Sequence, residues 1–159
     1  MVVEKISVEQ LLATVDVIYQ PFVRDLHSYL MESGCKASFE LKKSGPLASY
    51  KLGKPIRAVV NFGFRKEGMF VRIYAEHLNK YEAFLNTLPE QMAKGIAESS
   101  TCRRLAHGTC SPKCAGYEFE LHGEHFQKCR YSCFELFLSE EGNPFIKTFV
   151  ENEINARTA

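Results

Sequence analysis

The spacing of the hydrophobic residues changes twice along this chain, and this change restricts the fold more than any other feature. Between Ser7 and Leu30, apolar residues recur every three to four positions, as they do in amphipathic helices. From Ala37 to Ile73, apolar and polar residues alternate, which is the pattern of half-buried strands. The helical spacing returns after Glu76. The sequence therefore predicts helices, then a sheet, then further helices.

Short signals define several ends of these elements. Ser7 and Gln10 have the spacing of a capping box, in which each side chain accepts a hydrogen bond from the other residue's backbone amide. Pro21 suits the first turn of a second helix, and Gly34 suits its end. A turn at residues 66–68 separates two alternating runs and predicts a hairpin.

The second half adds more helices and strands. After the helical segments that follow Glu76, we expect a strand at residues 117–121, a return strand at 126–138, and a last helix that begins at Asn143-Pro144. Strands in consecutive runs, with helices before and after them, are typical of the α+β class. We predict an antiparallel sheet of five to six strands with helices packed mainly on one face, and a cysteine-rich loop.

The composition supports a single folded domain that spans residues 1–159. The chain is 45% hydrophobic and 25% charged, which is typical of globular proteins, and no linker interrupts it. Its net charge of +1 provides no global attraction for nucleic acid or anionic lipid. There is no apolar run long enough for a membrane helix, and the first residues do not have the pattern of a signal peptide, so we expect a cytoplasmic protein. Familiar enzyme motifs are absent, which favours a non-enzymatic function.

Five of the six cysteines fall within residues 99–134. Structural disulfides are rare in the cytosol, so such a cluster indicates metal binding or redox chemistry. We predict a structural zinc site, closed by four thiolates, whose ligands are Cys102, Cys110, Cys114 and Cys129. His107 is an alternative to Cys102 as a ligand.

Strand geometry explains why Cys133 is left out of this set. If Cys129 and Cys133 lie on one strand, four steps separate them by roughly 13 Å. Two thiolates on one zinc ion lie within about 4 Å of each other. Only a bulge or a break in the strand would allow both cysteines to bind the same ion.

Two other interpretations of the cysteines remain open. They are labile thiols in a redox or metal-handling protein, or they are small hydrophobic residues buried in the core. Thiol titration distinguishes a closed zinc site, which resists alkylation until the metal is removed, from an accessible reactive thiolate.

Residues 41–72 carry eight basic side chains against one carboxylate, that of Glu67. The basic residues are Lys42, Lys43, Lys51, Lys54, Arg57, Arg65, Lys66 and Arg72. If the sheet presents several of them together, an anionic ligand or nucleic-acid phosphate is a possible partner, and the interleaved aromatic residues Tyr50, Phe62, Phe64 and Phe70 would stack on bases. The alternative is that these aromatic residues pack in the core.

A second polar pattern lies on the predicted strand at residues 117–121 and its turn. Glu118, Glu120 and His122 alternate along one face, and His125 follows the turn. Paired carboxylates of this kind occur in catalytic sites, but they are also typical of a solvated strand face.

The cysteine-rich half resembles a known group of sequences. The run from Cys110 to Phe119, then Gly123, then Lys128-Cys129-Arg130-Tyr131, is similar to a family of uncharacterised small proteins from clostridia and related Firmicutes. The resemblance covers residues 57–150 and implies no known activity. The N-terminal helices and the strands up to Ile73 more distantly resemble the YdhG-type α+β domains, some of which are described as iron chaperones. This second resemblance implies metal handling, although the cysteine-rich segment departs from that family's pattern.

Overall fold

A computed structural model describes residues 4–53, 57–99, 108, 116–128 and 133–158. The predicted zinc ligands Cys102, Cys110, Cys114 and Cys129, and the alternative ligand His107, lie outside these residues. Within the described part of the chain, no helix is both long enough and apolar enough to cross a membrane.

The N-terminal segment contains the short strand β1 (Glu4–Lys5), helix α1 (Val8–Thr14), the 3-10 turn η1 (Val17–Tyr19) and helix α2 (Gln20–Glu32). The predicted capping box is confirmed, because Gln10 N donates to Ser7 Oγ at 3.1 Å and Ser7 N donates to Gln10 Oε1 at 2.8 Å. Pro21 occupies the first turn of α2. Gly34 follows the end of α2 with a φ of +94°, a conformation that glycine adopts without strain.

Six strands form the main sheet, in the order β1-β2-β3-β4-β5-β8. Besides β1, these are β2 (Lys36–Lys42), β3 (Gly45–Leu52), β4 (Arg57–Arg65), β5 (Gly68–Ile73) and β8 (Phe134–Phe137). Every pairing is antiparallel. The predicted hairpin between β4 and β5 is confirmed, with Arg65 paired to Gly68 across the turn.

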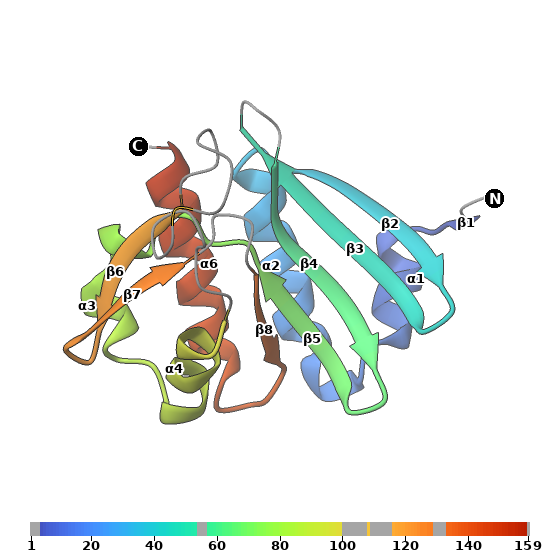
Figure 1. The fold of residues 1–159 in the computed structure, drawn as a ribbon. Coiled ribbons are helices and arrows are strands. Elements are labelled where there is room, and N and C mark those ends of the chain that lie inside the picture. Colours follow the sequence, from blue (N-terminus) through green and yellow to red (C-terminus); the bar gives the residue numbers. More distant parts are fainter. Residues whose placement is uncertain (1–3, 54–56, 100–107, 109–115, 129–132, 159) are drawn as a thin grey trace.

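Helices α1, α2 and the C-terminal helix α6 (Asn143–Thr158) lie behind the sheet in Figure 1 and cover one of its faces. Side chains from that face and from the helices form the hydrophobic core. Its fully buried members include Leu26, Tyr50, Phe62, Val71 and Phe149. The predicted α+β class, with helices mainly on one face of an antiparallel sheet, is thereby confirmed.

A smaller unit lies beside this sheet. It contains the 3-10 turn η2 (Leu78–Lys80), helices α3 (Glu82–Leu85) and α4 (Glu90–Ala97), and the two-stranded ribbon of β6 (Tyr117–Leu121) and β7 (Glu124–Lys128). His122 and Gly123 connect the two strands, both with positive φ. Two positive φ values in succession are typical of the tight turns that match the twist of a hairpin.

The predicted return strand at residues 126–138 is wrong as a single element. Strand β7 ends at Lys128 and pairs with β6, whereas β8 begins at Phe134 and pairs with β5 in the main sheet. Cys133 precedes β8 and belongs to neither strand, and Cys129 lies outside the described residues. The separation of roughly 13 Å that excluded Cys133 from the zinc site no longer applies, because it assumed four residues of continuous strand.

Candidate functional site

The sheet face opposite the helices carries a polar row that crosses five strands. Ser38 pairs with Ser49, Ser49 with Asn61, Asn61 with Arg72, and Arg72 with Glu135. Directly paired residues of antiparallel strands project from the same face, so these five side chains are neighbours. The residues next to them along each strand project from the opposite face, toward the helices. We call the face that carries the polar row the outer face.

An aromatic residue lies beside this row because a glycine makes room for it. Phe70 pairs with Gly63 on one side and with Phe137 on the other. A Cβ atom on Gly63 would lie 2.5 Å from the ring of Phe70, which is inside any normal contact distance. The ring of Phe70 therefore lies directly over the backbone of β4, and it is 4% exposed.

Two arginines converge on one carboxylate next to this ring. Arg72 donates to Glu135 Oε1 from Nε at 3.1 Å and from Nη2 at 2.7 Å. Arg65 donates from Nη2 to the same oxygen at 2.7 Å and from Nη1 to Oε2. Such forked contacts between guanidinium and carboxylate groups are stronger and more directional than single neutral hydrogen bonds. We call Arg65, Arg72 and Glu135 the arginine clamp.

Phe70 also holds the two guanidinium groups in place. The Cζ atoms of Arg65 and Arg72 lie 4.7 and 5.2 Å from the centre of its ring, within the range of cation–π attraction. Each arginine is thus fixed by a ring on one side and a carboxylate on the other. The clamp is therefore ordered before any ligand arrives, which reduces the entropy lost on binding.

The clamp changes the titration of its carboxylate. Partial burial alone would raise the pKa of Glu135, but the hydrogen bonds and positive charges of Arg65 and Arg72 outweigh burial, and the net pKa is below the usual range for Glu. Glu135 is therefore ionised throughout the neutral pH range.

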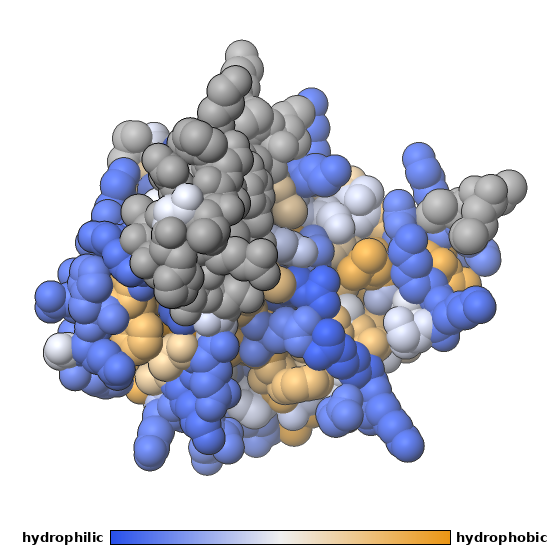
Figure 2. Space-filling view, in the orientation of Figure 1, coloured by the Kyte–Doolittle hydropathy of each residue, from blue (hydrophilic) through white to orange (hydrophobic). Residues whose placement is uncertain are grey.

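A groove of about 460 Å³ opens next to the clamp on the outer face. Its charged lining residues are all basic: Lys42, Arg65, Lys66 and Arg72. The rest of the lining is small or apolar and includes Gly63, Phe64 and Phe70. Figure 2 shows hydrophobic surface between hydrophilic side chains over β3, β4 and β5. This volume is in the range of small-molecule sites.

The structure thus brings together four of the eight basic residues of segment 41–72. Lys43 and Lys51 are exposed and do not line the groove, Lys54 lies outside the described residues, and the side chain of Arg57 is not described. Glu135, which completes the clamp, was not among the residues that the sequence singled out.

The interpretation of the interleaved aromatic residues as base-stacking groups is wrong for most of them. Tyr50 and Phe62 are 0% exposed, because they face the helices and pack edge-on against each other with ring centres 5.3 Å apart. Phe70 is covered by the clamp, and Phe64 is half-buried. The alternative of core packing is confirmed for Tyr50 and Phe62.

The polar face of β6 has the contacts of a solvated strand. Glu118 accepts a hydrogen bond from Gln127 at 2.8 Å and lies 3.7 Å from His125 Nε2. The backbone amide of Glu120 donates to Glu82 at 3.0 Å, and that of His122 donates to Asn86 at 2.9 Å. These contacts join β6 to β7 and to α3, and they do not place two carboxylates across a substrate-sized gap.

A buried carboxylate in α6 is a polar centre that sequence reasoning missed. Glu153 is 0% exposed and accepts hydrogen bonds from Tyr81 Oη at 2.7 Å, Arg157 Nε at 2.9 Å, and both the backbone amide and Nδ1 of His77 at 3.2 and 2.8 Å. Its position on the apolar stripe of the last helix, next to Ile154, was the available signal. With four donors, this carboxylate has the contacts of a structural group.

The described cysteines lie apart from each other. Cys35 is 5% exposed in the core, and burial raises the pKa of its thiol. Cys133 immediately precedes β8, and there too burial raises the pKa, against the opposing charge of Arg72. Within the described residues, no group of three or more His, Cys, Asp or Glu side chains is placed to hold a metal ion.

The described residues that flank the cysteine-rich segments are nevertheless close together. Lys128 Nζ donates to the carbonyl oxygens of Ala97 at 2.8 Å and Ser99 at 2.7 Å, and Tyr117 pairs with Lys128 across the ribbon. Ser99 precedes Cys102 by three residues, Tyr117 follows Cys114 by three, and Lys128 directly precedes Cys129.

Comparisons with models of protein families, with curated proteins and with solved structures gave no match. The function proposed below therefore rests on the residues of this chain alone.

Proposed function

We propose that this protein is a non-enzymatic binding domain that holds a small polyanion, with two or more phosphate or carboxylate groups, in the outer-face groove. Arg65 and Arg72 would bind one anionic group through their forked donors, and Lys42 and Lys66 would bind a second. We place this function in the cytoplasm.

The observation that carries the proposal is the arginine clamp itself. Two guanidinium groups, fixed against Phe70, already hold a carboxylate at hydrogen-bond distance beside an open groove. Glu135 thus occupies the position that an anionic group of the ligand would take. A ligand binds by sharing or replacing these contacts, so Glu135 lowers its affinity and favours ligands with more than one negative group.

A small ligand fits this site better than a nucleic acid does. The groove is of small-molecule size, and the rings of Tyr50 and Phe62 are buried beneath the sheet. Among the described residues of this face, Phe137 of the edge strand β8 is the exposed aromatic residue, at 41%, and Tyr74 is half-buried. Because single-stranded nucleic acids bind through rows of stacked bases, one exposed ring provides little of the required surface.

Calorimetric titration with pyrophosphate and with citrate, at constant ionic strength, tests the proposal. We expect saturable one-to-one binding of at least one of these probes. Because hydrogen bonds to charged groups contribute about 1.5–3 kcal/mol, Arg72→Gln should weaken binding by roughly tenfold to a hundredfold. Glu135→Gln should strengthen it, because the internal competitor loses its charge.

The matched control is Arg24→Gln. Arg24 pairs with Glu9 at 3.0 Å on the helical side of the molecule, so its removal changes the net charge equally without altering the groove. Equal weakening by Arg24→Gln and Arg72→Gln would indicate a diffuse charge effect and contradict the proposed site. Absence of binding by both probes, or much tighter binding of a single-stranded oligonucleotide, would also contradict it.

We further propose that a structural zinc ion stabilises the cysteine-rich half of the chain. Its ligands would be Cys102, Cys110, Cys114 and Cys129, and Cys133 or His107 could replace one of them. Two observations support this proposal. The described residues next to Cys102, Cys114 and Cys129 are joined by the contacts of Lys128 and by the pairing of β6 with β7. In addition, the ammonium group of Lys128 is 2% exposed and contacts two carbonyl oxygens and the ring of Phe126, and a nearby anion would stabilise it further.

Within the described part of the chain, no carboxylate supplies that anion. No ion pair links Lys128 to an acidic side chain of the described residues, and segments 100–107, 109–115 and 129–132 contain neither Asp nor Glu. Burial lowers the pKa of Lys128, and its two carbonyl acceptors carry only partial negative charges. A zinc ion with four thiolates carries two negative charges and would offset this ammonium group.

Elemental analysis of protein purified without chelator or affinity metal tests this second proposal. We expect about one zinc ion per chain for a single four-ligand site. Cys110→Ser should lose the zinc, and Cys35→Ser, which changes a thiol of the core, should retain it. Metal-free wild-type protein with freely titratable thiols would instead support the labile-thiol alternative.

A further inference from the structure

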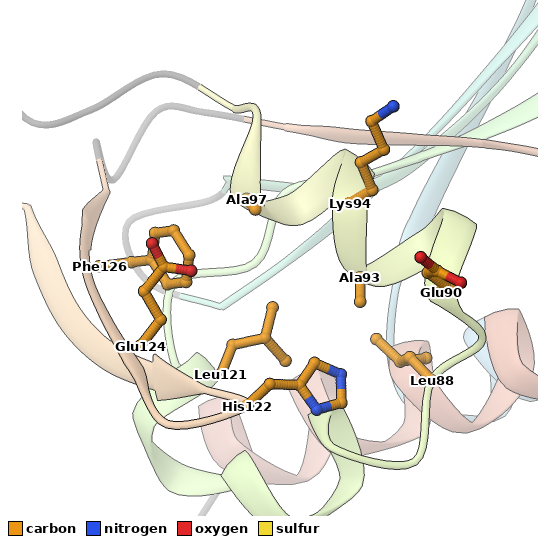
Figure 3. A pocket seen from close by; sticks show the side chains of 9 residues that line it. All are labelled: Leu88, Glu90, Ala93, Lys94, Ala97, Leu121, His122, Glu124 and Phe126. Atoms are coloured by element: carbon orange, nitrogen blue, oxygen red, sulfur yellow. The ribbon is translucent and has the colours of Figure 1, made fainter.

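A second cavity, of about 450 Å³, lies between helix α4 and the tip of the β6–β7 ribbon. Figure 3 shows its lining side chains, which come from α4, from the residues before it and from both strands. They are Leu88, Glu90, Ala93, Lys94, Ala97, Leu121, His122, Glu124 and Phe126. We call this cavity the ribbon cleft. It shares no residue with the outer-face groove.

The floor of the ribbon cleft is apolar. Leu88, Ala93 and Leu121 are 5%, 6% and 3% exposed, and the half-buried ring of Phe126 forms one wall. An apolar floor of small-molecule size with a few polar groups at the rim is typical of ligand pockets in proteins. Such a floor favours a ligand with a hydrophobic group about the size of one aromatic ring.

Two carboxylates lie on opposite sides of the rim of the cleft, and Lys94 and His122 are also among its lining residues. Glu90 and Glu124 are exposed, and neither forms an ion pair with another described residue. Lys94, the basic residue of the rim, pairs instead with Glu98 at 3.8 Å, and its side chain points away from the cleft in Figure 3. The ring of Phe126 adds a face that attracts cations. The side of the rim that Glu124 and Phe126 form therefore complements a positive charge.

Hydrogen bonds on both sides fix the walls of the cleft relative to each other. At the tip of the ribbon, the backbone amide of His122 donates to Asn86 at 2.9 Å. At the other end, Lys128 Nζ donates to the carbonyl oxygen of Ala97 in α4 at 2.8 Å. The cleft is thus formed before a ligand binds, which lowers the entropic cost of association.

We propose that the ribbon cleft binds a small organic amine, with an aromatic or aliphatic body against Leu88 and Leu121 and its ammonium group beside Glu124 and the ring of Phe126. The proposal does not depend on the anion site of the sheet. The ligand proposed for the cleft is a cation, whereas the ligand proposed for the groove is an anion.

A pair of probes with matched bodies and opposite charges tests the proposal. Titration with 2-phenylethylamine and with 3-phenylpropionate, followed by amide chemical shifts, compares an ammonium and a carboxylate on nearly the same apolar frame. We expect saturable shifts at residues 88–97 and 121–126 with the amine, and an affinity for the carboxylate at least fivefold weaker.

Two variants separate the charge contribution from the apolar contribution. Glu124→Gln should weaken amine binding severalfold, whereas Glu140→Gln, at an exposed site in the loop before α6, should not. Ala97→Leu should reduce amine binding by filling the cleft. Equal affinity for the two probes, no shifts at these residues, or equal effects of Glu124→Gln and Glu140→Gln would overturn the proposal.

Discussion

At Gly63 the absence of a side chain decides how the outer face is built. The ring of Phe70 occupies the space that any larger residue would fill, and both arginines of the clamp pack against that ring. One backbone position thereby determines where two guanidinium groups point. The sequence marks Gly63 only as a glycine within a strand pattern, which indicates a close approach without naming the partner.

Gly63→Ala should destabilise the protein, because the new methyl group would overlap the Phe70 ring. We expect a loss of about 1–3 kcal/mol in the free energy of unfolding, measured by urea denaturation. Gly95→Ala is the matched control, since Gly95 lies within α4 with open space around its Cα. That change should instead stabilise by roughly 0.5–1 kcal/mol. Equal effects of the two substitutions would contradict the packing described for Phe70.

Glu135 should make stability depend on pH in a defined direction. Its pKa is lower in the folded protein than in the unfolded chain, so its contribution is complete above the unfolded carboxyl pKa of roughly 4.3 and is lost as pH falls through the folded value. The difference in unfolding free energy between wild type and Glu135→Gln should therefore be largest near neutral pH and shrink in acid. A difference that stays constant down to pH 2 would show that the clamp carries no net charge interaction.

At the level of elements, helix α6 has a buried polar anchor, Glu153, in addition to its apolar contacts with the core. Glu153 links α6 to η2 and Tyr81, while Arg157 donates from the same helix to the carbonyl oxygens of Tyr74 and Ala58. Arg157 is the compensating cation, because its side chain is 9% exposed and contacts Glu153 directly. The buried negative charge of Glu153 is thus compensated by Arg157 and by the hydrogen bonds from His77 and Tyr81.

Glu153→Gln should destabilise the fold strongly. The substitution leaves the buried Arg157 without its counter-ion, and breaking a buried pair from one side costs about 3–5 kcal/mol. Chemical denaturation measures the change. Glu151→Gln on the same helix, at a half-buried site, should cost far less. A loss below 1 kcal/mol for Glu153→Gln would mean that the carboxylate is not the anchor of α6.

The elements that sequence reasoning predicted are those with local signals. The capping box of α1, the end of α2 at Gly34 and the β4–β5 turn depend on residues within a few positions of each other. The break between β7 and β8 was missed because residues 128–137 contain neither Gly nor Pro, although the alternation changes phase where Cys133 and Phe134 are adjacent apolar residues. For the arginine clamp, the sequence indicated the two arginines but not the carboxylate. Glu135 is 70 residues from Arg65 and 63 residues from Arg72, and only the strand order brings the three side chains together.

At the scale of the whole molecule, the two cavities have opposite character. The groove on the main sheet is basic and contains an internal carboxylate at its edge, whereas the ribbon cleft has an apolar floor and two carboxylates on its rim. A net charge of +1 conceals this separation, because it sums the basic and acidic residues of the whole chain. Overall composition could therefore exclude a global electrostatic field but could not reveal either site.

The most direct test of the central claim, anion binding at the arginine clamp, is a map of amide chemical shifts during titration with pyrophosphate. Saturable shifts confined to residues 42–47, 63–72 and 134–137, and abolished in Arg65→Gln, are the predicted result. Shifts spread over the helical side of the protein, or shifts unchanged by Arg65→Gln, would show that the clamp is only a structural ion pair and would contradict the proposed function.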